Sequence, residues 1–246
     1  MVLTNESRGF FNRMNIISKR LTLYVIGLFL LSLGVSFSIQ ANLGVSPVSS
    51  LAYAISLTSG LTIGITTILA NILFVFVQII LNKKRIDIRE FIVQLSIVFL
   101  FGIFMDLTLA IVQLLPAPTT LVGRYLFLLI SLYIISAGLL AYFSAKLPLM
   151  PYDALTYVVS DRFNMKFGKA KISSDLINVA VAGIVCLVFI QSLGAIGIGT
   201  ILAAYFIGKI LGKIIPRFQP LLQSWVYKSK DDVIIESEEI VEPVQQ

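Results

Sequence analysis

The sequence contains no histidine and a single cysteine, Cys186, among its 246 residues. A chain without histidine has neither a serine–histidine–aspartate triad nor a cysteine–histidine pair, and it lacks a common ligand of zinc. Cys186 forms no disulfide within the chain, and its neighbours valine, leucine and isoleucine indicate a small buried side chain. We therefore expect no enzymatic activity, no metal site and no cofactor.

Charged residues are also scarce. They make up 13% of the chain, hydrophobic residues make up 57%, and the mean hydropathy is +0.93. Soluble domains carry about 25% charged residues, so these values exclude an ordinary soluble domain and a disordered chain and predict a polytopic membrane protein. The net charge is +6. Because the cations flank apolar segments, we expect the lipid bilayer as their partner and no nucleic acid.

Long apolar runs, by contrast, are abundant. A membrane-spanning helix needs about 20 apolar residues, and the segments that reach this length are 21–41, 62–82, 90–114, 122–144, 171–191 and 194–214. Two shorter stretches, 47–58 and 151–161, begin with Pro47 and Pro151, and proline suits the first turn of a helix. A helix of this length reaches roughly 18 Å, less than the roughly 30 Å hydrocarbon core. We predict that both stretches are re-entrant half-helices.

The sequence contains an internal repeat. A shift of 104 residues aligns two halves without a gap for some forty positions. The matched pairs include Gly34 and Gly138, Pro47 and Pro151, Tyr53 and Tyr157, and Gly64 and Gly168, and Gly102 matches Gly208 after a small change of offset. Each half, 21–115 and 122–214, therefore consists of a helix, a half-helix and two further helices. We expect structural roles for the two prolines and for Gly64 and Gly168, and we expect Gly34, Gly138, Gly102 and Gly208 to permit close helix packing.

The distribution of cations predicts the topology. With segment 1–20 in the cytoplasm and both half-helices re-entrant, the cluster at 83–89 and Lys146 are cytoplasmic and only Arg124 lies outside. An eight-pass arrangement places the cluster and Lys146 outside, which the positive-inside rule disfavours. Residues 215–228 are expected to form an amphipathic segment at the inner interface, followed by an acidic, disordered cytoplasmic tail at 229–246. Both termini of this cell-membrane protein are then cytoplasmic.

Together these features predict an all-α polytopic membrane protein of two inverted repeats, each with three transmembrane helices and one re-entrant half-helix. Inverted repeats with broken helices near the bilayer midplane are typical of transporters and channels. We expect a secondary transporter or channel for a small polar solute. The alternative is a packed bundle without a path, which acts as a non-transporting scaffold or regulator of a partner protein or complex. The sequence leaves open whether the chain forms a homo-oligomer.

Two tandem motifs resemble those of a known family. The first copy, residues 43–51, reads Leu-Gly-Val-Ser-Pro-Val-Ser-Ser-Leu, and the second, residues 147–155, reads Leu-Pro-Leu-Met-Pro-Tyr-Asp-Ala-Leu. Glycine-containing stretches follow at 59–64 and 164–168. Over about residues 20–214 the chain resembles the YczE/YyaS/YitT group of bacterial integral membrane proteins. The resemblance implies a multi-pass membrane protein and no particular substrate. The first copy has Ser49 where the family motif has an acid, so only Asp153 carries that acid here.

Asp153, near the start of the second half-helix, is the strongest candidate for a solute or proton site. A carboxylate there either binds a cationic group or titrates, or it satisfies free N–H groups of the first turn. Its counterparts Ser49 and Ser50 can cap a helix without charge. Asp175 and Asn71 occupy equivalent repeat positions, and we expect them to face the half-helices or to join neighbouring helices by hydrogen bonds.

Asp106 lies deep in an apolar segment, where an ionisable residue needs a partner or a water-filled cavity. Arg124, at the start of the next helix, is the expected ion-pair partner, and a gate or proton site is the alternative. Tyr53 and Tyr157, which the repeat aligns, either line a cavity or pack within the bundle.

Overall fold

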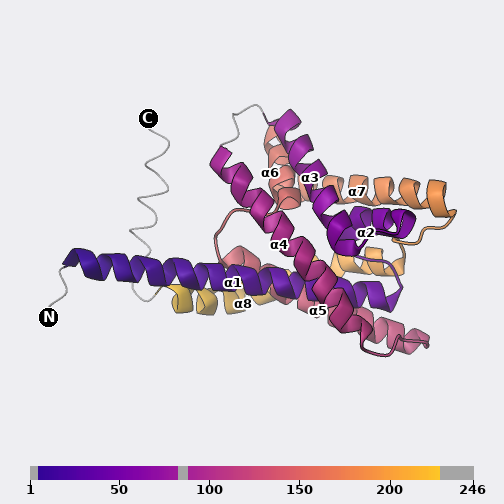
Figure 1. Cartoon of the computed structure of the whole chain (residues 1–246), viewed down its shortest axis with the longest axis horizontal. Helices are drawn as coiled ribbons and strands as arrows, with labels where there is room; N and C mark the ends of the chain where they lie inside the picture. The colour runs from indigo at the N-terminus through magenta and orange to yellow at the C-terminus, as the bar shows by residue number, and fades with distance from the viewer. Residues whose placement is uncertain (1–4, 83–87, 228–246) are drawn as a thin grey trace.

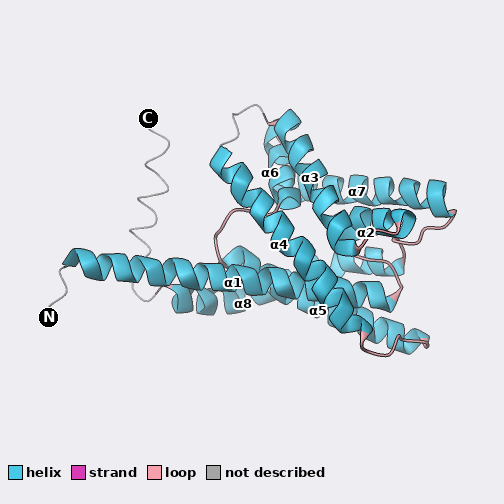
Figure 2. Cartoon of the chain, viewed as in Figure 1, coloured by secondary structure: helices cyan, strands magenta, loops and turns pink. Residues whose placement is uncertain are grey.

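A computed structural model describes residues 5–82 and 88–227 (Figure 1). These residues form eight helices, and no strand occurs among them (Figure 2). The helices are α1 (Asn5–Ala41), α2 (Pro47–Ser59), α3 (Ile63–Leu81), α4 (Ile88–Gln113), α5 (Leu121–Ser144), α6 (Pro151–Arg162), α7 (Phe167–Ile190) and α8 (Ile198–Val226). The predicted acidic tail at 229–246 and the cations at 83–85 lie outside the described residues.

Within the described ranges, six helices are long and apolar enough to cross a membrane: α1, α3, α4, α5, α7 and α8. They correspond to the six predicted segments, which confirms the all-helical class and the number of long apolar helices. α2 and α6 have 13 and 12 residues and correspond to the two short stretches. Each begins at its proline, Pro47 or Pro151, because the fixed φ and the missing N–H of proline suit a first helical turn.

The last helix is longer than the sequence predicts. α8 continues through Pro216 and Pro220 to Val226, although a proline inside a helix removes a backbone hydrogen bond. The end of α8 is anchored on α1, where the Lys19 ammonium donates a hydrogen bond to the Trp225 carbonyl at 2.8 Å. Val226 is buried at the same end. These contacts hold the final turns of α8 against the rest of the protein.

The helices form two layers that α4 joins (Figure 1). α1, α5 and α8 pack together in one layer, and α2, α3, α6 and α7 pack together in the other. α4 contacts α1 in the first layer and α3 in the second. Leu28, Met105 and Tyr142 are among the largest fully buried side chains, so the main core follows α1, α4 and α5.

α1 and α5 cross closely at two glycines. Gly34 on α1 lies against Ile135, and Gly138 on α5 lies against Leu31. Residues 34 and 138 are 104 positions apart, and so are residues 31 and 135, so the repeat relates the two contacts. A side chain at either glycine would overlap the opposite helix. The predicted role of Gly34 and Gly138 in close helix packing is therefore confirmed.

Each short helix packs against the third helix of the other half. Asn178 on α7 donates a hydrogen bond to the Pro47 carbonyl at 2.6 Å and to the Val48 carbonyl at 3.2 Å. On the other side, Phe74 on α3 packs on Tyr152, with ring centroids 5.1 Å apart. Positions 74 and 178 differ by 104, as do 48 and 152. The same contact is thus made twice with different side chains, and it fixes the first turns of α2 and α6.

The halves differ in how their third and fourth helices meet. In the first half, Gly64 on α3 lies against the backbone of Gly102 on α4, and we call this contact the α3–α4 seam. The corresponding glycines Gly168 on α7 and Gly208 on α8 define the α7–α8 seam, and each has open space where a side chain would be. The predicted close packing at Gly208 is wrong for this structure, because α7 packs on α2 while α8 packs on α5.

Candidate functional site

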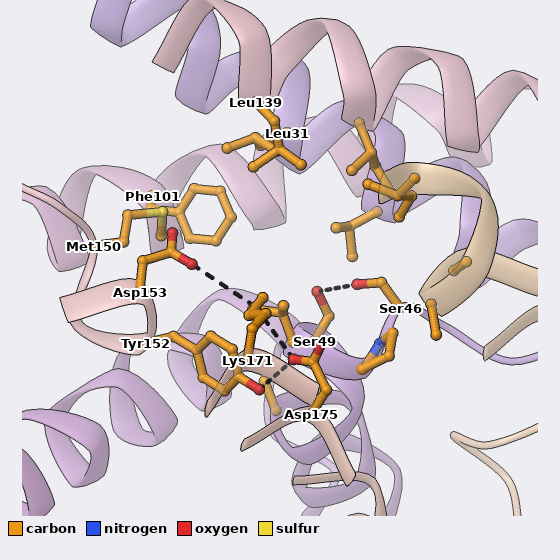
Figure 3. A pocket seen from close by; sticks show the side chains of 18 of the residues that line it. Leu31, Ser46, Ser49, Phe101, Leu139, Met150, Tyr152, Asp153, Lys171 and Asp175 are labelled. Atoms are coloured by element: carbon orange, nitrogen blue, oxygen red, sulfur yellow. Dashed lines mark hydrogen bonds and ion pairs between the residues drawn. The ribbon is translucent and has the colours of Figure 1, made fainter. Parts of the chain in front are cut away.

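A cavity of about 330 Å³ lies at the starts of α2 and α6, and all eight helices contribute to its wall (Figure 3). This volume falls at the lower end of the range for small-molecule pockets, about 300–1,000 Å³. The apolar part of the wall includes Leu31, Val35, Phe101, Met105, Ile135 and Leu139, and the polar part comprises Ser46, Ser49, Thr67, Asn71, Tyr152, Asp153, Lys171 and Asp175. The cavity therefore has an apolar region and a polar region.

The polar wall uses the same positions of both halves. The pairs that line it are Ser49 and Asp153, Thr67 and Lys171, and Asn71 and Asp175, each separated by 104 residues. The first half supplies the neutral member of every pair and the second half supplies the charged member. The cavity therefore combines one uncharged polar wall, from α2 and α3, with one charged wall, from α6 and α7.

The charged wall is organised around Lys171. Its ammonium lies 3.2 Å from Oδ1 of Asp175 and 3.8 Å from Oδ1 of Asp153 (Figure 3). It also lies 4.3 Å from the centre of the Tyr152 ring, and the Tyr152 hydroxyl donates a hydrogen bond to Asp175 at 2.5 Å. The Asp153 side chain is 15% exposed. We call Asp153, Lys171 and Asp175 the charged cluster; it carries two carboxylates for one ammonium.

α5 contributes Tyr142 beside this cluster. The Tyr142 hydroxyl accepts a hydrogen bond from the Met150 N–H at 2.6 Å. Met150 precedes the first turn of α6, and its side chain makes no capping hydrogen bond. Tyr142 thus holds the start of α6, the helix that carries Asp153, at the edge of the cavity.

The uncharged wall has an unsatisfied hydrogen-bond acceptor. Asn71 is 6% exposed, and its side-chain N–H donates to the Thr67 carbonyl at 2.9 Å, but its Oδ1 has no hydrogen-bond partner. Nearby, the Ser46 hydroxyl donates to the Ser49 hydroxyl at 3.2 Å. Ser50 is fully buried, donates to the Pro47 carbonyl and does not line the cavity. A buried acceptor without a donor indicates a place where a ligand or a water can donate.

Besides Ser50, three predicted site residues lie away from the cavity. Tyr157 is 52% exposed, and its ring packs on Phe167 at 4.3 Å. Tyr53 packs with the buried Cys186 between α2 and α7. Asp106 sits at the α3–α4 seam. The repeat aligned the two tyrosines correctly, but the helix faces that carry them point away from the cavity.

Asp106 caps α3 rather than pairing with Arg124. Its Oδ1 accepts from the Gly64 N–H at 2.7 Å and its Oδ2 accepts from the Thr62 hydroxyl at 2.8 Å. The side chain of Arg124 donates instead to the Pro118 carbonyl at 3.5 Å. The predicted ion pair is therefore not formed, because both carboxylate oxygens already have donors at the free N-terminus of α3.

We expect Asp106→Ala to destabilise the protein by about 1.5–3 kcal/mol, the usual value of a hydrogen bond to a charged group. The substitution removes both bonds at the α3–α4 seam and leaves the cavity wall intact. Thermal unfolding in detergent measures the effect, with the exposed Asp161→Ala as control. Unchanged stability of Asp106→Ala would contradict the capping role.

Lys171 is the main cavity residue that the sequence did not single out. Two signals pointed to it: it precedes Asp175 by one helical turn, and it aligns with Thr67 in the repeat. Asp153, Asp175, Asn71 and Ser49, which the sequence did single out, all line the cavity. Among the described residues, no group of three or more histidine, cysteine or acidic side chains is placed to hold a metal ion. The arrangement is suited to binding by charge and hydrogen bonds.

The family model described as "Family of unknown function (DUF6198)" matches residues 18–216. The chain belongs to this family. In Bacillus subtilis (strain 168), "Uncharacterized protein YyaS" is 30% identical over 193 residues, 78% of this chain and 90% of YyaS. "Uncharacterized membrane protein YczE" from the same organism is 30% identical over 205 residues, 82% of this chain and 88% of YczE. No solved structure matches the chain.

Membership of the family confirms the resemblance to YczE and YyaS inferred from the tandem motifs. The matched range, residues 18–216, contains every residue that lines the cavity. One relative is named as a membrane protein, and the described part of this chain has six helices long and apolar enough to cross a bilayer. The chain is a multi-pass membrane protein.

Proposed function

We propose that this DUF6198 family member is a secondary transporter that binds one small solute in the central cavity and opens the cavity alternately to the two sides of the membrane. The observation that carries the proposal is the paired construction of the cavity. Both short helices begin at it, and its polar walls use the same positions of the two halves. The proposal involves binding and translocation, and it assigns no chemical step to the site.

In this proposal the two halves are inverted repeats. Each contributes three long helices, an odd number of crossings, so the second half runs through the membrane in the opposite sense. α2 and α6 reach only about 20 Å and 18 Å at the helical rise of about 1.5 Å per residue, and they re-enter from opposite faces of the bilayer. Both termini are cytoplasmic, as the positive-inside rule favours. The recurrence of contacts at a spacing of 104 residues supports this arrangement.

The unequal seams support alternating access. The α3–α4 seam is closed by Gly64 and Gly102, whereas the α7–α8 seam is open. Ala204 and Gly208 line the cavity from α8 and are exposed, so the cavity opens through the α7–α8 seam. In transporters built from inverted repeats, exchange of conformations between the repeats gives the state that faces the opposite side. We therefore propose a second state in which Gly168 meets Gly208 and the α3–α4 seam opens.

We expect cysteines at Gly168 and Gly208 to cross-link in the membrane. The substitutions are made in a Cys186→Ser background, because Cys186 is the single native cysteine. The open seam separates the two positions in the present structure, so an oxidant joins them only if the seam closes during the functional cycle. Gel mobility under non-reducing conditions measures the cross-linked fraction.

The matched control for the cross-link is the pair Gly168→Cys and Gly212→Cys. Gly212 lies one turn after Gly208 on α8 and also has open space around it, but it does not align with Gly102. Efficient cross-linking of Gly168 to Gly208 with little cross-linking to Gly212 supports the proposed second state. Absence of cross-linking in both pairs would favour a static bundle, which is the scaffold alternative.

A further inference from the structure

The charged cluster holds one negative charge more than it holds positive charge. Asp153 and Asp175 share a single ammonium, that of Lys171, and the three side chains are 15%, 22% and 29% exposed. An uncompensated charge in a membrane interior is costly, so such a charge is paired or neutralised. The cavity therefore requires one additional positive charge, from a bound cation or from a proton on one of the carboxylates.

The groups around Asp153 supply no second cation. The titratable side chains that face it from the neighbouring helices are Tyr24, Tyr142, Tyr152, Lys171 and Asp175. Lys171 is the cation among these described residues, and it already contacts both carboxylates. The opposite wall carries Ser49, Thr67 and Asn71, which are neutral. Since the described residues supply no second cation at Asp153 and Asp175, we assign the missing positive charge to a ligand or a proton.

Asn71 gives a second and independent indication of a ligand. The residue is 6% exposed, it lines the cavity, and its Oδ1 has no hydrogen-bond donor. An ammonium group provides up to three N–H donors and no acceptor, as does the side chain of lysine. The amide oxygen of Asn71 together with the carboxylates of Asp153 and Asp175 matches that donor set.

The apolar part of the cavity defines the remainder of the ligand. Leu31, Leu139 and Phe101 lie across the cavity from Tyr152 and Asp175 (Figure 3). Pockets bind the body of a ligand with apolar side chains and fix its orientation with a few polar groups. A volume of about 330 Å³ suits a small molecule rather than a lipid with two acyl chains.

Building on the transport function proposed above, we infer that the solute is an organic monocation with an ammonium group and a compact apolar body, and that it exchanges for one proton. In the empty cavity Asp153, the least exposed member of the charged cluster, carries one proton. When the ammonium binds, this proton leaves to the aqueous phase on the open side. One positive charge enters and one leaves, so the charge of the site is unchanged.

The test compares three probes of similar size in isothermal titration of the purified full-length protein. They are 2-phenylethylammonium, 2-phenylethanol, which lacks the charge, and phenylalanine, which adds a carboxylate. We expect the amine to bind at least tenfold more tightly than either of the others. Titration in buffers of different ionisation enthalpy should show the release of a proton when the amine binds.

Two variants of the charged cluster should act in opposite directions. Asp153→Asn should weaken amine binding at least tenfold and remove the proton release, whereas Lys171→Gln should strengthen amine binding, because a competing cation is lost. The controls are Asp161→Asn and Lys169→Gln, which lie at exposed positions of the same helices. They should change neither amine binding nor proton release. Asp153→Glu keeps the charge and should bind the amine more tightly than Asp153→Asn. This comparison distinguishes loss of the carboxylate from misfolding.

The results that overturn this inference are distinct from those that overturn the transport function. Equal binding of amine and alcohol, tighter binding of phenylalanine, or weaker amine binding by Lys171→Gln would each exclude an organic monocation as the preferred solute. A failure of all three probes to bind would do the same. In each case, cross-linking of Gly168→Cys with Gly208→Cys would still support a transporter, but one for a different class of solute.

Discussion

We expect Asp153→Asn to reduce solute transport at least about 30-fold while the protein stays folded. The carboxylate lies at the start of α6, 3.8 Å from the Lys171 ammonium. Removal of one member of a buried charge pair costs about 2–5 kcal/mol in binding. The asparagine side chain occupies nearly the same volume, so the packing at the start of α6 is kept. Transport should therefore be lost without loss of the fold.

Uptake into proteoliposomes measures this effect, with 2-phenylethylammonium as the probe and an opposing proton gradient as the driving force. Asp161→Asn is the matched control, since Asp161 is on the same helix but exposed. Thermal unfolding of both variants reports whether the fold is kept. Transport at the level of the natural sequence in Asp153→Asn would contradict a role for this carboxylate in transport.

We expect the same substitution at two glycines that the repeat aligns, Gly208→Leu and Gly102→Leu, to have different consequences. A side chain at position 208 enters open space, so Gly208→Leu should leave stability nearly unchanged. It should nevertheless abolish transport, because the leucine prevents closure of the α7–α8 seam. A side chain at position 102 meets Ile68 and the backbone of Gly64 at once. Gly102→Leu should destabilise the protein by roughly 1–3 kcal/mol, the usual cost of overpacking.

Thermal unfolding and uptake, measured on the same preparations, separate these two effects. Gly212→Leu is the control on α8, because Gly212 also has open space around it and lies outside the proposed contact. If Gly208→Leu transports normally, the α7–α8 seam does not close in the cycle and the proposed second state is wrong. If Gly102→Leu is as stable as the natural sequence, α3 and α4 do not pack closely at Gly64 and Gly102.

The helices and their pairing were largely predictable, because their signals are local or repeat along the chain. Hydropathy located the six long helices, Pro47 and Pro151 marked the starts of the short ones, and the shift of 104 residues aligned Gly34 with Gly138. The final turns of α8 were not predicted, since residues 215–228 were expected to form a separate interfacial segment and the stabilising contact with Lys19 is about 200 residues away. A local signal cannot include such a contact.

The candidate site was predictable only in part, for the same reason. Ser49, Asn71, Asp153 and Asp175 could be selected because polar residues at matching positions are rare in apolar segments. The partners of Asp106, Thr62 and Gly64, could not be predicted, because the contact depends on how closely α3 approaches α4. Nor does a repeat indicate which of two equivalent seams is closed. Gly102 and Gly208 occupy nearly corresponding positions of the two halves, so the repeat predicts the same role for both.

The most direct test of the central claim is the accessibility of position 49 from the two sides of the membrane. Ser49 lines the uncharged wall of the cavity, and a cysteine placed there in the Cys186→Ser background reports whether water reaches the site. Right-side-out and inside-out vesicles are treated with a membrane-impermeant thiol reagent. Alternating access predicts labelling from both sides, with bound solute protecting the cysteine. If the reagent labels the cysteine from neither side, the bundle is closed and the transporter proposal is contradicted.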